Sequence, residues 1–430
     1  MRRKIEAQLL AWKEKRAGRM PLIVNGARQV GKTYILRQFG ETHFKNVVYV
    51  NLEINLAIAS YFGDNIMPEK LLRYLESSAG EKIIPGETLI IFDEIQSCER
   101  ALTSLKYFCE ETPEYHIAAA GSLLGVAINR QHYSFPVGKV ETLTLYPLDF
   151  EEYLWARGKA LLCEEVRKAF VSMSPLPDAL HQEATDLYRE YLIVGGMPAC
   201  INTFLKSGSF LDVPLVQNEI LDNYIADMAK YANSGDSVKI RACYNSIPAQ
   251  LAKENKKFQY KVVQKGGSST LFGASIEWLN LAGVVLKCQR VTNATEPISV
   301  YVDLSAFKLY MGDVGLLVMK SGISQQTVLS GNGNIFMGAV TENYVAQQLV
   351  AKGYDLFYWE SSSTAELDFV LQKENQIVGM EVKKGEHVRS RSLSVFVNAY
   401  KPAYSIRLSL KNFGEKDGVK SVPLYAAFCV

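Results

Sequence analysis

Short apolar runs alternate with longer helix-like stretches over the first third of the chain. The runs cover residues 22–24, 47–50, 89–92, 116–120 and 140–145, and each has the length of a buried strand. Several buried strands separated by helical segments favour a doubly wound α/β sheet. We therefore predict an α/β domain over residues 1–160.

The pattern changes after this domain. Residues 161–235 show helical periodicity without strands, and turn formers interrupt it at residues 195–198, which predicts a helical lid or connector. Residues 236–330 contain three short helical patterns with breaks at Pro248 and at residues 266–267, then an apolar strand at 284–286 and a wing-like stretch. Three helices followed by a β hairpin resemble a winged helix-turn-helix.

A small α/β domain is predicted over residues 331–430, after the glycines at 331 and 333. The pattern predicts a helix at about 336–351, three strands, a helix near 393–400, and strands at 405–410 and 424–428. About 100 residues are enough for an independent domain.

Composition narrows the class of protein. With 48% hydrophobic and 21% charged residues, the chain has an ordinary globular composition, and a net charge of +2 means that nucleic acid would need a local basic face. Seven dispersed cysteines without a Cys-x-x-Cys pair indicate reduced thiols. Neither a signal peptide nor an uncharged apolar run of about 18 residues is evident. We expect a cytoplasmic protein with no membrane partner.

A phosphate-binding loop follows the first apolar run. Residues 26–33 read G-A-R-Q-V-G-K-T between that run and a helix-like stretch, which fits G-x-x-x-x-G-K-[ST] in its required context. The glycines let main-chain N–H groups surround phosphate oxygens, Lys32 places a charge on the β- and γ-phosphates, and the Thr33 hydroxyl binds Mg²⁺. The alternative is a structural glycine turn. The predicted nucleotide-binding residues here are Gly26, Ala27, Arg28, Gln29, Val30, Gly31, Lys32 and Thr33.

Two further strand ends carry polar residues. The apolar run 89–92 ends in Asp93 and Glu94, at the sheet edge where open α/β folds bind ligands. Asp93 is predicted to hold Mg²⁺ and Glu94 to orient or deprotonate the attacking water, although a helix N-cap is the plain alternative. Ser122 follows the run 116–120 and is expected either to touch the γ-phosphate or to cap a helix. Nothing in the sequence identifies the base, but the absence of an N-K-x-D stretch favours ATP over GTP.

These motifs together resemble the bacterial and archaeal AAA-type ATPases that carry a C-terminal domain of unassigned function. The resemblance covers nearly the whole chain and implies an ATPase core, a winged-helix-like connector and a nuclease-like C-terminal domain. Related sequences tend to have arginine where this chain has Lys139, and lysine lacks the planar fork of an arginine finger. Arg100 and Arg130 are other candidates. The motifs that carry the resemblance are residues 26–33, 93–96, 121–122, 146–150 and 195–198.

A second set of chemical residues lies in the last domain. Glu342 falls on a predicted helix, Asp368 on a strand, and Glu381 and Lys383 on the next strand, where alternate side chains share a face. Asp368 and Glu381 are expected to bind metal. Glu342 would complete the shell or hold a metal-bound water, and Lys383 would stabilise charge or lower the pKa of that water. This order resembles the PD-(D/E)xK nucleases. The alternative is a solvated strand face with an ion pair. A basic rim that could hold phosphates, or serve solubility alone, comprises Lys384, His387, Arg389 and Arg391.

Two hypotheses of function follow. The first is an ATP-dependent nucleic-acid enzyme in which hydrolysis at Lys32 and Glu94 repositions the winged-helix-like and nuclease-like domains on DNA, with Mg²⁺ as cofactor. The second is a nucleotide-controlled binding switch that hydrolyses slowly and cleaves nothing. AAA-type relatives often form rings, so a homo-oligomer is a candidate assembly. The aromatic residues at 354–359 could stack on bases, but at alternating strand positions they are more often core.

Overall fold

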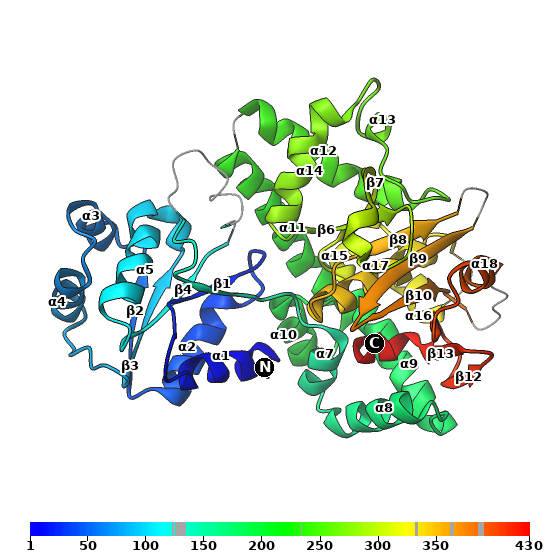
Figure 1. Cartoon of the computed structure of the whole chain (residues 1–430), viewed down its shortest axis with the longest axis horizontal. Coiled ribbons are helices and arrows are strands. Elements are labelled where there is room, and N and C mark those ends of the chain that lie inside the picture. Colours follow the sequence, from blue (N-terminus) through cyan, green and yellow to red (C-terminus); the bar gives the residue numbers. More distant parts are fainter. Residues whose placement is uncertain (123, 125–134, 233, 332–333, 362–364, 386–390) are drawn as a thin grey trace. The chain divides into compact units, whose positions relative to one another are not determined.

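The computed structural model describes residues 1–122, 124, 135–232, 234–331, 334–361, 365–385 and 391–430 (Figure 1). Arg130, Gly333, His387 and Arg389 lie outside the described residues. The described chain forms two compact units. The N-terminal unit comprises residues 2–146 and 281–283, and the C-terminal unit comprises residue 1, residues 147–280 and residues 284–430.

The N-terminal unit contains a parallel sheet of five strands in the order β2-β3-β4-β1-β5. Its strands are β1 (Leu22–Asn25), β2 (Asn46–Asn51), β3 (Thr88–Asp93), β4 (His116–Ala120) and β5 (Glu141–Thr144). Its helices are α1 (Ile5–Glu14), α2 (Lys32–His43), α3 (Leu56–Asp64), α4 (Pro68–Ala79), the 3₁₀ helix η1 (Ile95–Ser97) and α5 (Glu99–Glu111). Each predicted apolar run thus contributes to one strand of the sheet.

Helices cover both faces of this sheet. Ile90 and Phe92 of β3 share one apolar cluster with residues of α3, α4 and α5. Alternate strand residues point to the opposite face, where Leu89 lies within reach of Gly40 in α2. Because β1 pairs with β4 and not with β2, the strand order reverses beside β1. The predicted doubly wound α/β fold is confirmed, and a switch point of this kind is where such folds bind ligands.

The C-terminal unit joins a helical region to a sheet of eight strands in the order β12-β13-β11-β10-β9-β8-β6-β7. The strands are β6 (Val285–Val291), β7 (Val302–Met311), β8 (Phe357–Glu360), β9 (Glu366–Lys373), β10 (Gln376–Val382), β11 (Ser405–Ser409), β12 (Gly414–Lys416) and β13 (Val419–Pro423). The helices before the sheet are α7 (Phe150–Ala156), α8 (Ala160–Ser172), α9 (Asp178–Val194), α10 (Pro198–Ser207), η2 (Phe210–Asp212), α11 (Val213–Tyr231), α12 (Ser234–Leu251), α13 (Tyr260–Val263) and α14 (Ser269–Leu281). The later helices are η3 (Ile298–Tyr301), α15 (Val314–Ser321), α16 (Gln325–Ser330), α17 (Met337–Ala351), α18 (Arg391–Tyr400) and η4 (Leu424–Cys429).

One sheet of the C-terminal unit contains strands from both of the last two predicted domains. Three helical segments do precede a β hairpin, since α12, α13 and α14 come before the antiparallel strands β6 and β7. However, β6 also pairs in parallel with β8, so one sheet crosses the expected boundary between residues 330 and 331. Backbone pairing between β6 and β8 therefore joins the hairpin of β6 and β7 to strands that follow residue 330.

Two local expectations are corrected. Residues 424–428 lie in the 3₁₀ helix η4 and not in a strand; the segment is apolar and fully buried, and such a short run fits a buried strand and a buried helical turn equally well. Helix α12 continues past Pro248, where the Ala252 N–H donates to the Pro248 carbonyl at 2.9 Å. In both places, apolar or turn-forming residue types were poor guides to the local backbone.

A buried polar network explains the glycine pair at residues 195–196. Asp313 accepts hydrogen bonds from the Gly196 N–H at 2.6 Å and from the Leu316 N–H at 3.0 Å. A side chain at Gly196 would place its Cβ atom 2.1 Å from the Leu148 carbonyl oxygen, and the Leu148 N–H donates to the Gly196 carbonyl. The two segments of unassigned chemistry, 146–150 and 195–198, therefore pack against each other and serve the fold.

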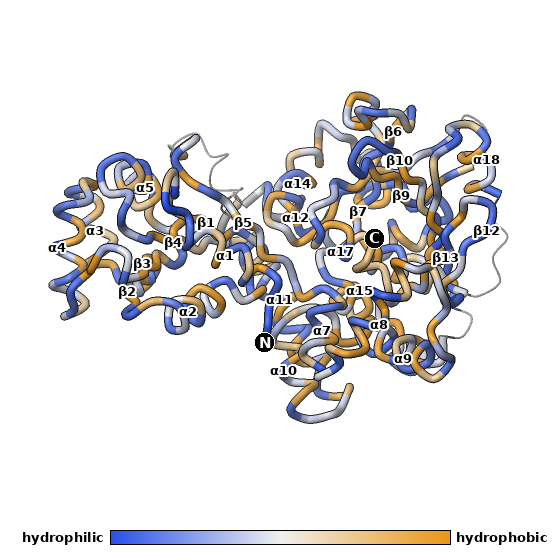
Figure 2. Tube along the Cα trace, turned by 60° about the horizontal axis from the view of Figure 1, so that its bottom comes forward, coloured by the Kyte–Doolittle hydropathy of each residue, from blue (hydrophilic) through white to orange (hydrophobic). Residues whose placement is uncertain are grey.

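Apolar and polar stretches are mixed along the tube in both units (Figure 2). No helix among the described residues is both long enough and apolar enough to cross a bilayer.

Candidate functional site

The segment between β1 and α2 has the backbone of a phosphate-binding loop. Gly26, Gln29 and Gly31 have φ angles of 143°, 67° and 97°, and α2 begins immediately afterwards at Lys32. A Cβ atom at Gly26 would lie 2.1 Å from the carbonyl oxygen of Leu145, so only glycine fits there. Ala27, Arg28 and Val30 complete the turn. The loop thus directs a helix N-terminus toward the carboxyl edge of the sheet, which favours an anion.

The ammonium group of Lys32 lies over this loop. Its Nζ atom donates to the carbonyl oxygens of Gly26 at 2.9 Å and Ala27 at 2.8 Å, and the side chain is buried. The loop is therefore closed on itself by its own lysine. In phosphate-binding loops, such an ammonium group donates hydrogen bonds to phosphate oxygens.

A hydroxyl and a carboxylate meet beside the loop. The Thr33 hydroxyl, at the start of α2, donates to the two oxygens of Asp93 at 3.1 and 2.9 Å. Asp93 ends β3, is buried, and also accepts a hydrogen bond from the Tyr49 hydroxyl at 2.7 Å. Burial and the bond to Asp93 raise the pKa of Tyr49 to about 12. Oxygen ligands of this kind fit Mg²⁺, so Thr33 and Asp93 are suited to hold it.

Glu94 has a strained, left-handed backbone. Its φ angle is 51°, and its carboxylate accepts hydrogen bonds from the Gln96 side-chain amide at 2.5 Å and the Ser122 hydroxyl at 3.4 Å. Ser122 therefore contacts Glu94, and this contact brings the ends of β3 and β4 together. Gln96 belongs to the motif at 93–96, but sequence reasoning gave it no role.

Sequence reasoning also missed Arg3. The residue is 6% exposed, and its guanidinium group donates to the Val30 carbonyl at 3.1 Å and to the Tyr146 carbonyl at 2.7 Å. Of the arginine-finger candidates, Arg100 donates to the Phe62 carbonyl at 2.8 Å and Lys139 pairs with Glu110 at 2.9 Å. Arg3 thus contacts the phosphate-binding loop, but it does so through a backbone carbonyl of the loop, as a group that supports the loop.

In the C-terminal unit, β9 and β10 bring the predicted acidic residues together. The register pairs Phe369 with Met380, so Asp368 and Glu381 lie opposite each other with their side chains on one face. Asp368 accepts a hydrogen bond from the Val382 N–H at 2.7 Å. Lys383 pairs with Glu381 at 2.8 Å. Glu381 and Lys383 therefore lie on one face, as predicted. They also form the ion pair that the alternative to a metal site, a strand face with an ion pair, would contain.

Glu342 of α17 faces the same sheet and is surrounded by donors. It pairs with Lys256, accepts a hydrogen bond from the Tyr310 hydroxyl at 3.2 Å, and lies 3.9 Å from the Lys308 ammonium. Burial alone would raise the pKa of Glu342, but the charges of Lys256 and Lys308 lower it. Burial, followed by the charge of Glu342, raises the pKa of Asp368 to about 7. We call these residues the carboxylate cluster: Lys256, Lys308, Tyr310, Glu342, Glu366, Asp368, Glu381 and Lys383.

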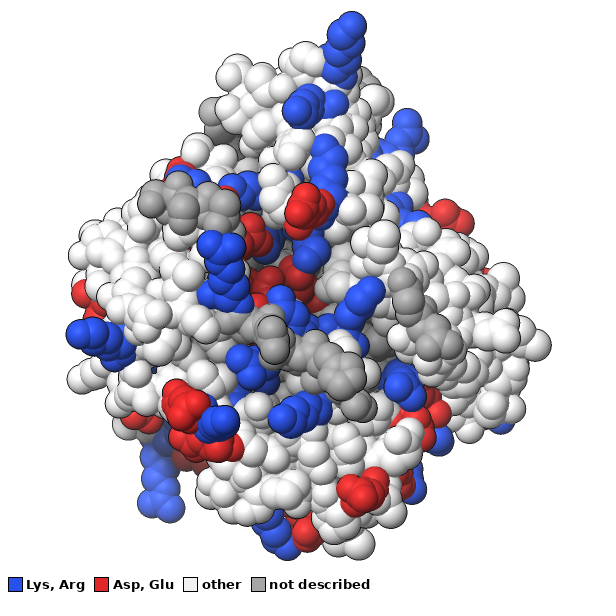
Figure 3. Space-filling model, turned by 90° about the vertical axis from the view of Figure 1, so that its right-hand side faces the viewer, with Lys and Arg blue, Asp and Glu red and all other residues white. Residues whose placement is uncertain are grey.

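Lysines already neutralise much of this carboxylate cluster. Lys308 is fully buried and pairs with Glu366 at 2.5 Å. Acidic side chains gather in a hollow with Lys and Arg side chains around it on the face shown in Figure 3. Within the described residues, no group of three or more His, Cys, Asp or Glu side chains is arranged to hold a metal ion. The predicted carboxylates are near one another, but as arranged they do not form a ready metal site.

The neighbours of the carboxylate cluster have other partners. Lys384 donates to the Asn334 carbonyl at 2.9 Å, and Arg391 begins α18. The aromatic residues of β8 are buried, and Trp359 packs against Phe396 and Tyr400 of α18. They belong to the core, which was the favoured interpretation.

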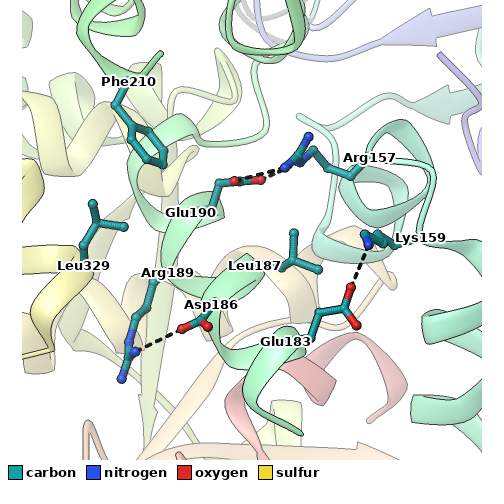
Figure 4. Close-up of a pocket in the computed structure, with 9 residues that line it drawn as sticks. All are labelled: Arg157, Lys159, Glu183, Asp186, Leu187, Arg189, Glu190, Phe210 and Leu329. Carbon is teal, nitrogen blue, oxygen red and sulfur yellow. Dashed lines mark hydrogen bonds and ion pairs between the residues drawn. The ribbon is translucent and has the colours of Figure 1, made fainter. Parts of the chain in front are cut away.

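A pocket of about 740 Å³ lies elsewhere in the C-terminal unit (Figure 4). Three ion pairs cross its wall: Arg157 with Glu190 at 2.6 Å, Lys159 with Glu183 at 2.7 Å, and Arg189 with Asp186 at 3.3 Å. None of the predicted site residues lines it. Its charges are paired within the wall, so it presents no unbalanced charge to a ligand.

Family comparisons divide the chain into three matched segments. Residues 18–154 match a family described as "AAA domain". Residues 185–327 and 337–427 match two families described as domains of unknown function, DUF8612 and DUF4143. Residues 18–154 are therefore similar to AAA domains, which supports the AAA-type P-loop ATPase that the resemblance implied. The description of the last family assigns no activity, so its nuclease-like character stays a prediction.

Relatives along the whole chain are distant. An uncharacterized protein of Methanocaldococcus jannaschii is 23% identical over 410 residues, covering 90% of this chain and 80% of that protein. The Walker-type ATPase of Pyrococcus abyssi is 13% identical, covering 74% of this chain and 95% of that chain with a TM-score of 0.46. The ORC1 protein of Aeropyrum pernix, solved in complex with DNA, is 12% identical, covering 75% and 93% with a TM-score of 0.30.

Proposed function

We propose that this protein binds and hydrolyses ATP at the site formed by the phosphate-binding loop and the end of β3. The observation that carries the proposal is the meeting of the Thr33 hydroxyl and the Asp93 carboxylate, at 2.9 Å, beside a loop that fits phosphates. A hydroxyl and an acid in this relation are the groups that hold Mg²⁺ in P-loop enzymes. When bound, Mg²⁺ neutralises charge on the β- and γ-phosphates.

Each residue then has a defined task. The loop N–H groups and Lys32 bind the phosphates, and Thr33 and Asp93 hold the metal. Glu94 orients the attacking water and accepts its proton. Gln96 and Ser122 fix the Glu94 carboxylate through its Oε2 atom.

The test compares Lys32→Ala with Lys45→Ala, an exposed lysine whose partner is Glu87. We expect Lys32→Ala to lower phosphate release from ATP by about 100-fold or more, because the ammonium acts on developing phosphate charge, and Lys45→Ala to match the wild type. Calorimetric titration with ATP and GTP in the presence of Mg²⁺ identifies the base. Absence of binding by any common nucleoside triphosphate would contradict the proposal.

We further propose that ATP turnover is coupled to nucleic-acid binding or Mg²⁺-dependent DNA cleavage by the C-terminal unit. The support is the shared sheet face of Asp368 and Glu381, with Glu342 above it and Lys383 beside it. Asp368→Ala is expected to remove nicking of plasmid DNA and leave ATP hydrolysis unchanged. Intact DNA across a screen of Mg²⁺ and Mn²⁺ concentrations would count against cleavage.

The alternative is a nucleotide-controlled binding switch with an inactive nuclease-like domain. The lysines paired with Glu342 and Glu381 support it, because a neutralised cluster needs no further cation. Under this hypothesis, Lys32→Ala changes the affinity for a partner or for DNA, and Glu381→Ala changes no measured activity. Assaying Lys32→Ala and Asp368→Ala together for both activities separates the two hypotheses.

A further inference from the structure

The carboxylate cluster contains an ammonium group from a distant segment of the chain. Lys256 lies in the loop between α12 and α13, has a left-handed backbone with φ of 47°, and pairs with Oε1 of Glu342 on α17. The side chains are 19% and 4% exposed, respectively. Lys256 is thus the more accessible partner, and it covers a buried carboxylate.

The same loop is fixed next to Lys256. The Lys257 ammonium binds both oxygens of Glu360, at 2.6 and 2.5 Å. The Phe258 N–H donates to the Phe307 carbonyl at 2.9 Å, and the two rings stack with centroids 5.4 Å apart. These contacts place the loop beside the sheet, so that Lys256 reaches Glu342.

One acceptor of the carboxylate cluster remains without a donor. Glu381 is 2% exposed and its Oε1 atom pairs with Lys383, but its buried Oε2 atom has no hydrogen-bond partner. Its place opposite Asp368 turns the carboxylates of both residues to the face on which Glu342 lies. A buried carboxylate oxygen without a protein partner has room for a further donor or cation, and its negative charge favours a cation.

We propose that the Lys256 ammonium occupies the cation position of the carboxylate cluster, and that a divalent metal ion binds there only when Lys256 leaves. This rests on the proposed metal-dependent role of the C-terminal unit. An ammonium group and a divalent cation repel at contact distance, and Mg²⁺ and Mn²⁺ prefer oxygen ligands that Lys256 now covers. Lys256, which belongs to the loop before α13 and not to the strands and helix that carry the acids, therefore blocks metal binding at the cluster.

The experiment measures Mn²⁺ binding to the full chain without nucleotide, by the electron paramagnetic resonance signal of free Mn²⁺. Lys256→Gln removes the positive charge at this position, and Lys256→Arg keeps it. Lys257→Gln is the control, because it removes the neighbouring positive charge, which pairs with Glu360. Mn²⁺ binding is assigned to the cluster where it is lost when Glu342→Gln is introduced into the same protein. We expect Lys256→Gln to bind Mn²⁺ there about tenfold or more tightly than the wild type, Lys256→Arg and Lys257→Gln.

Each other outcome overturns the inference in a recognisable way. If all four proteins bind Mn²⁺ equally at the cluster, Lys256 does not compete, although the metal-dependent role stands. If none binds, both the inference and that role fail, while ATP hydrolysis at the N-terminal unit is untouched. Thermal unfolding of every variant shows whether Lys256→Gln folds. Should it unfold early, Lys256→Met, which keeps the apolar stem and removes the charge, takes its place, and it must bind Mn²⁺ more tightly than Lys256→Arg or the inference is wrong.

Discussion

The phosphate-binding loop takes its geometry from eight consecutive residues, whereas the carboxylate cluster takes its side chains from α17, β7, β9, β10 and the loop before α13. In the first, residues with positive φ and the start of α2 shape the loop, the Lys32 ammonium binds the loop's own carbonyls, and the Thr33 hydroxyl binds Asp93. In the second, acids and lysines neutralise one another. Both sites hold their charges in internal contacts, but Lys32 uses carbonyls of its own loop, whereas the lysines of the carboxylate cluster reach acids on distant segments of the chain.

The largest expected effect concerns Lys308, which has no counterpart in the N-terminal site. Burial alone would lower its pKa, but Glu342, Glu366 and Asp368 raise it above the ordinary value, so it stays charged. Lys308→Met leaves buried carboxylates unbalanced and should lower the free energy of unfolding by about 3–5 kcal/mol. Urea denaturation measures this, with the exposed Lys416→Met as control.

The double variant Lys308→Met, Glu366→Gln sharpens the comparison, because it removes both partners of the buried pair. Part of the lost stability should return. An equal or larger loss in the double variant would mean that the ammonium does not serve to neutralise the acids.

The next effect belongs to the N-terminal site. Glu94→Gln keeps the size of the side chain but removes its basicity, so ATP should still bind while turnover falls by about 100-fold. Phosphate release and binding of a fluorescent ATP analogue measure the two separately. Glu87→Gln, a surface carboxylate paired with Lys45, should change neither. Full turnover by Glu94→Gln would remove Glu94 from catalysis.

A smaller effect is expected at Arg3, which holds the loop from behind. Arg3→Ala removes hydrogen bonds to the carbonyls of Val30 and Tyr146 and should weaken ATP binding by about tenfold, because the loop is no longer fixed in its bound shape. The exposed Arg16→Ala is the control. Calorimetry gives the affinities. If the Arg3→Ala protein binds ATP as tightly as the Arg16→Ala protein, local sequence alone shapes the loop.

The two sites differ in how far sequence could predict them. Residues 26–33 dictate their own backbone, and the apolar run before Asp93 dictates a buried strand, so the N-terminal fold and its central groups follow from adjacent residues. Arg3 and Gln96 were missed because their roles depend on which carbonyl or carboxylate lies near them after folding.

The carboxylate cluster shows more clearly which contacts local sequence patterns cannot predict. Strand alternation correctly placed Glu381 and Lys383 on one face, and the register of β9 brought Asp368 beside them. Lys256 and Lys308 are more than 30 residues before Glu342 along the chain, and no spacing rule links them. The pairing of β6 with β8 is equally non-local, so the local pattern that sets a boundary at the glycines 331 and 333 does not reveal it.

The smallest expected effect tests the metal side of the phosphate site. The Tyr49 hydroxyl donates to Asp93 at 2.7 Å, and its pKa of about 12 keeps it a donor throughout the neutral range. Tyr49→Phe removes this bond but leaves Thr33, so we expect about threefold more Mg²⁺ for half-maximal ATP hydrolysis, with the same change at pH 7 and pH 9. Tyr34→Phe, at a tyrosine that is 60% exposed, is the control. A tenfold change would show that Asp93 depends on Tyr49 for its position. No change would show that the hydrogen bond from Thr33 alone fixes the Asp93 carboxylate. The N-terminal site would then need no group outside the phosphate-binding loop and the end of β3 to position its carboxylate.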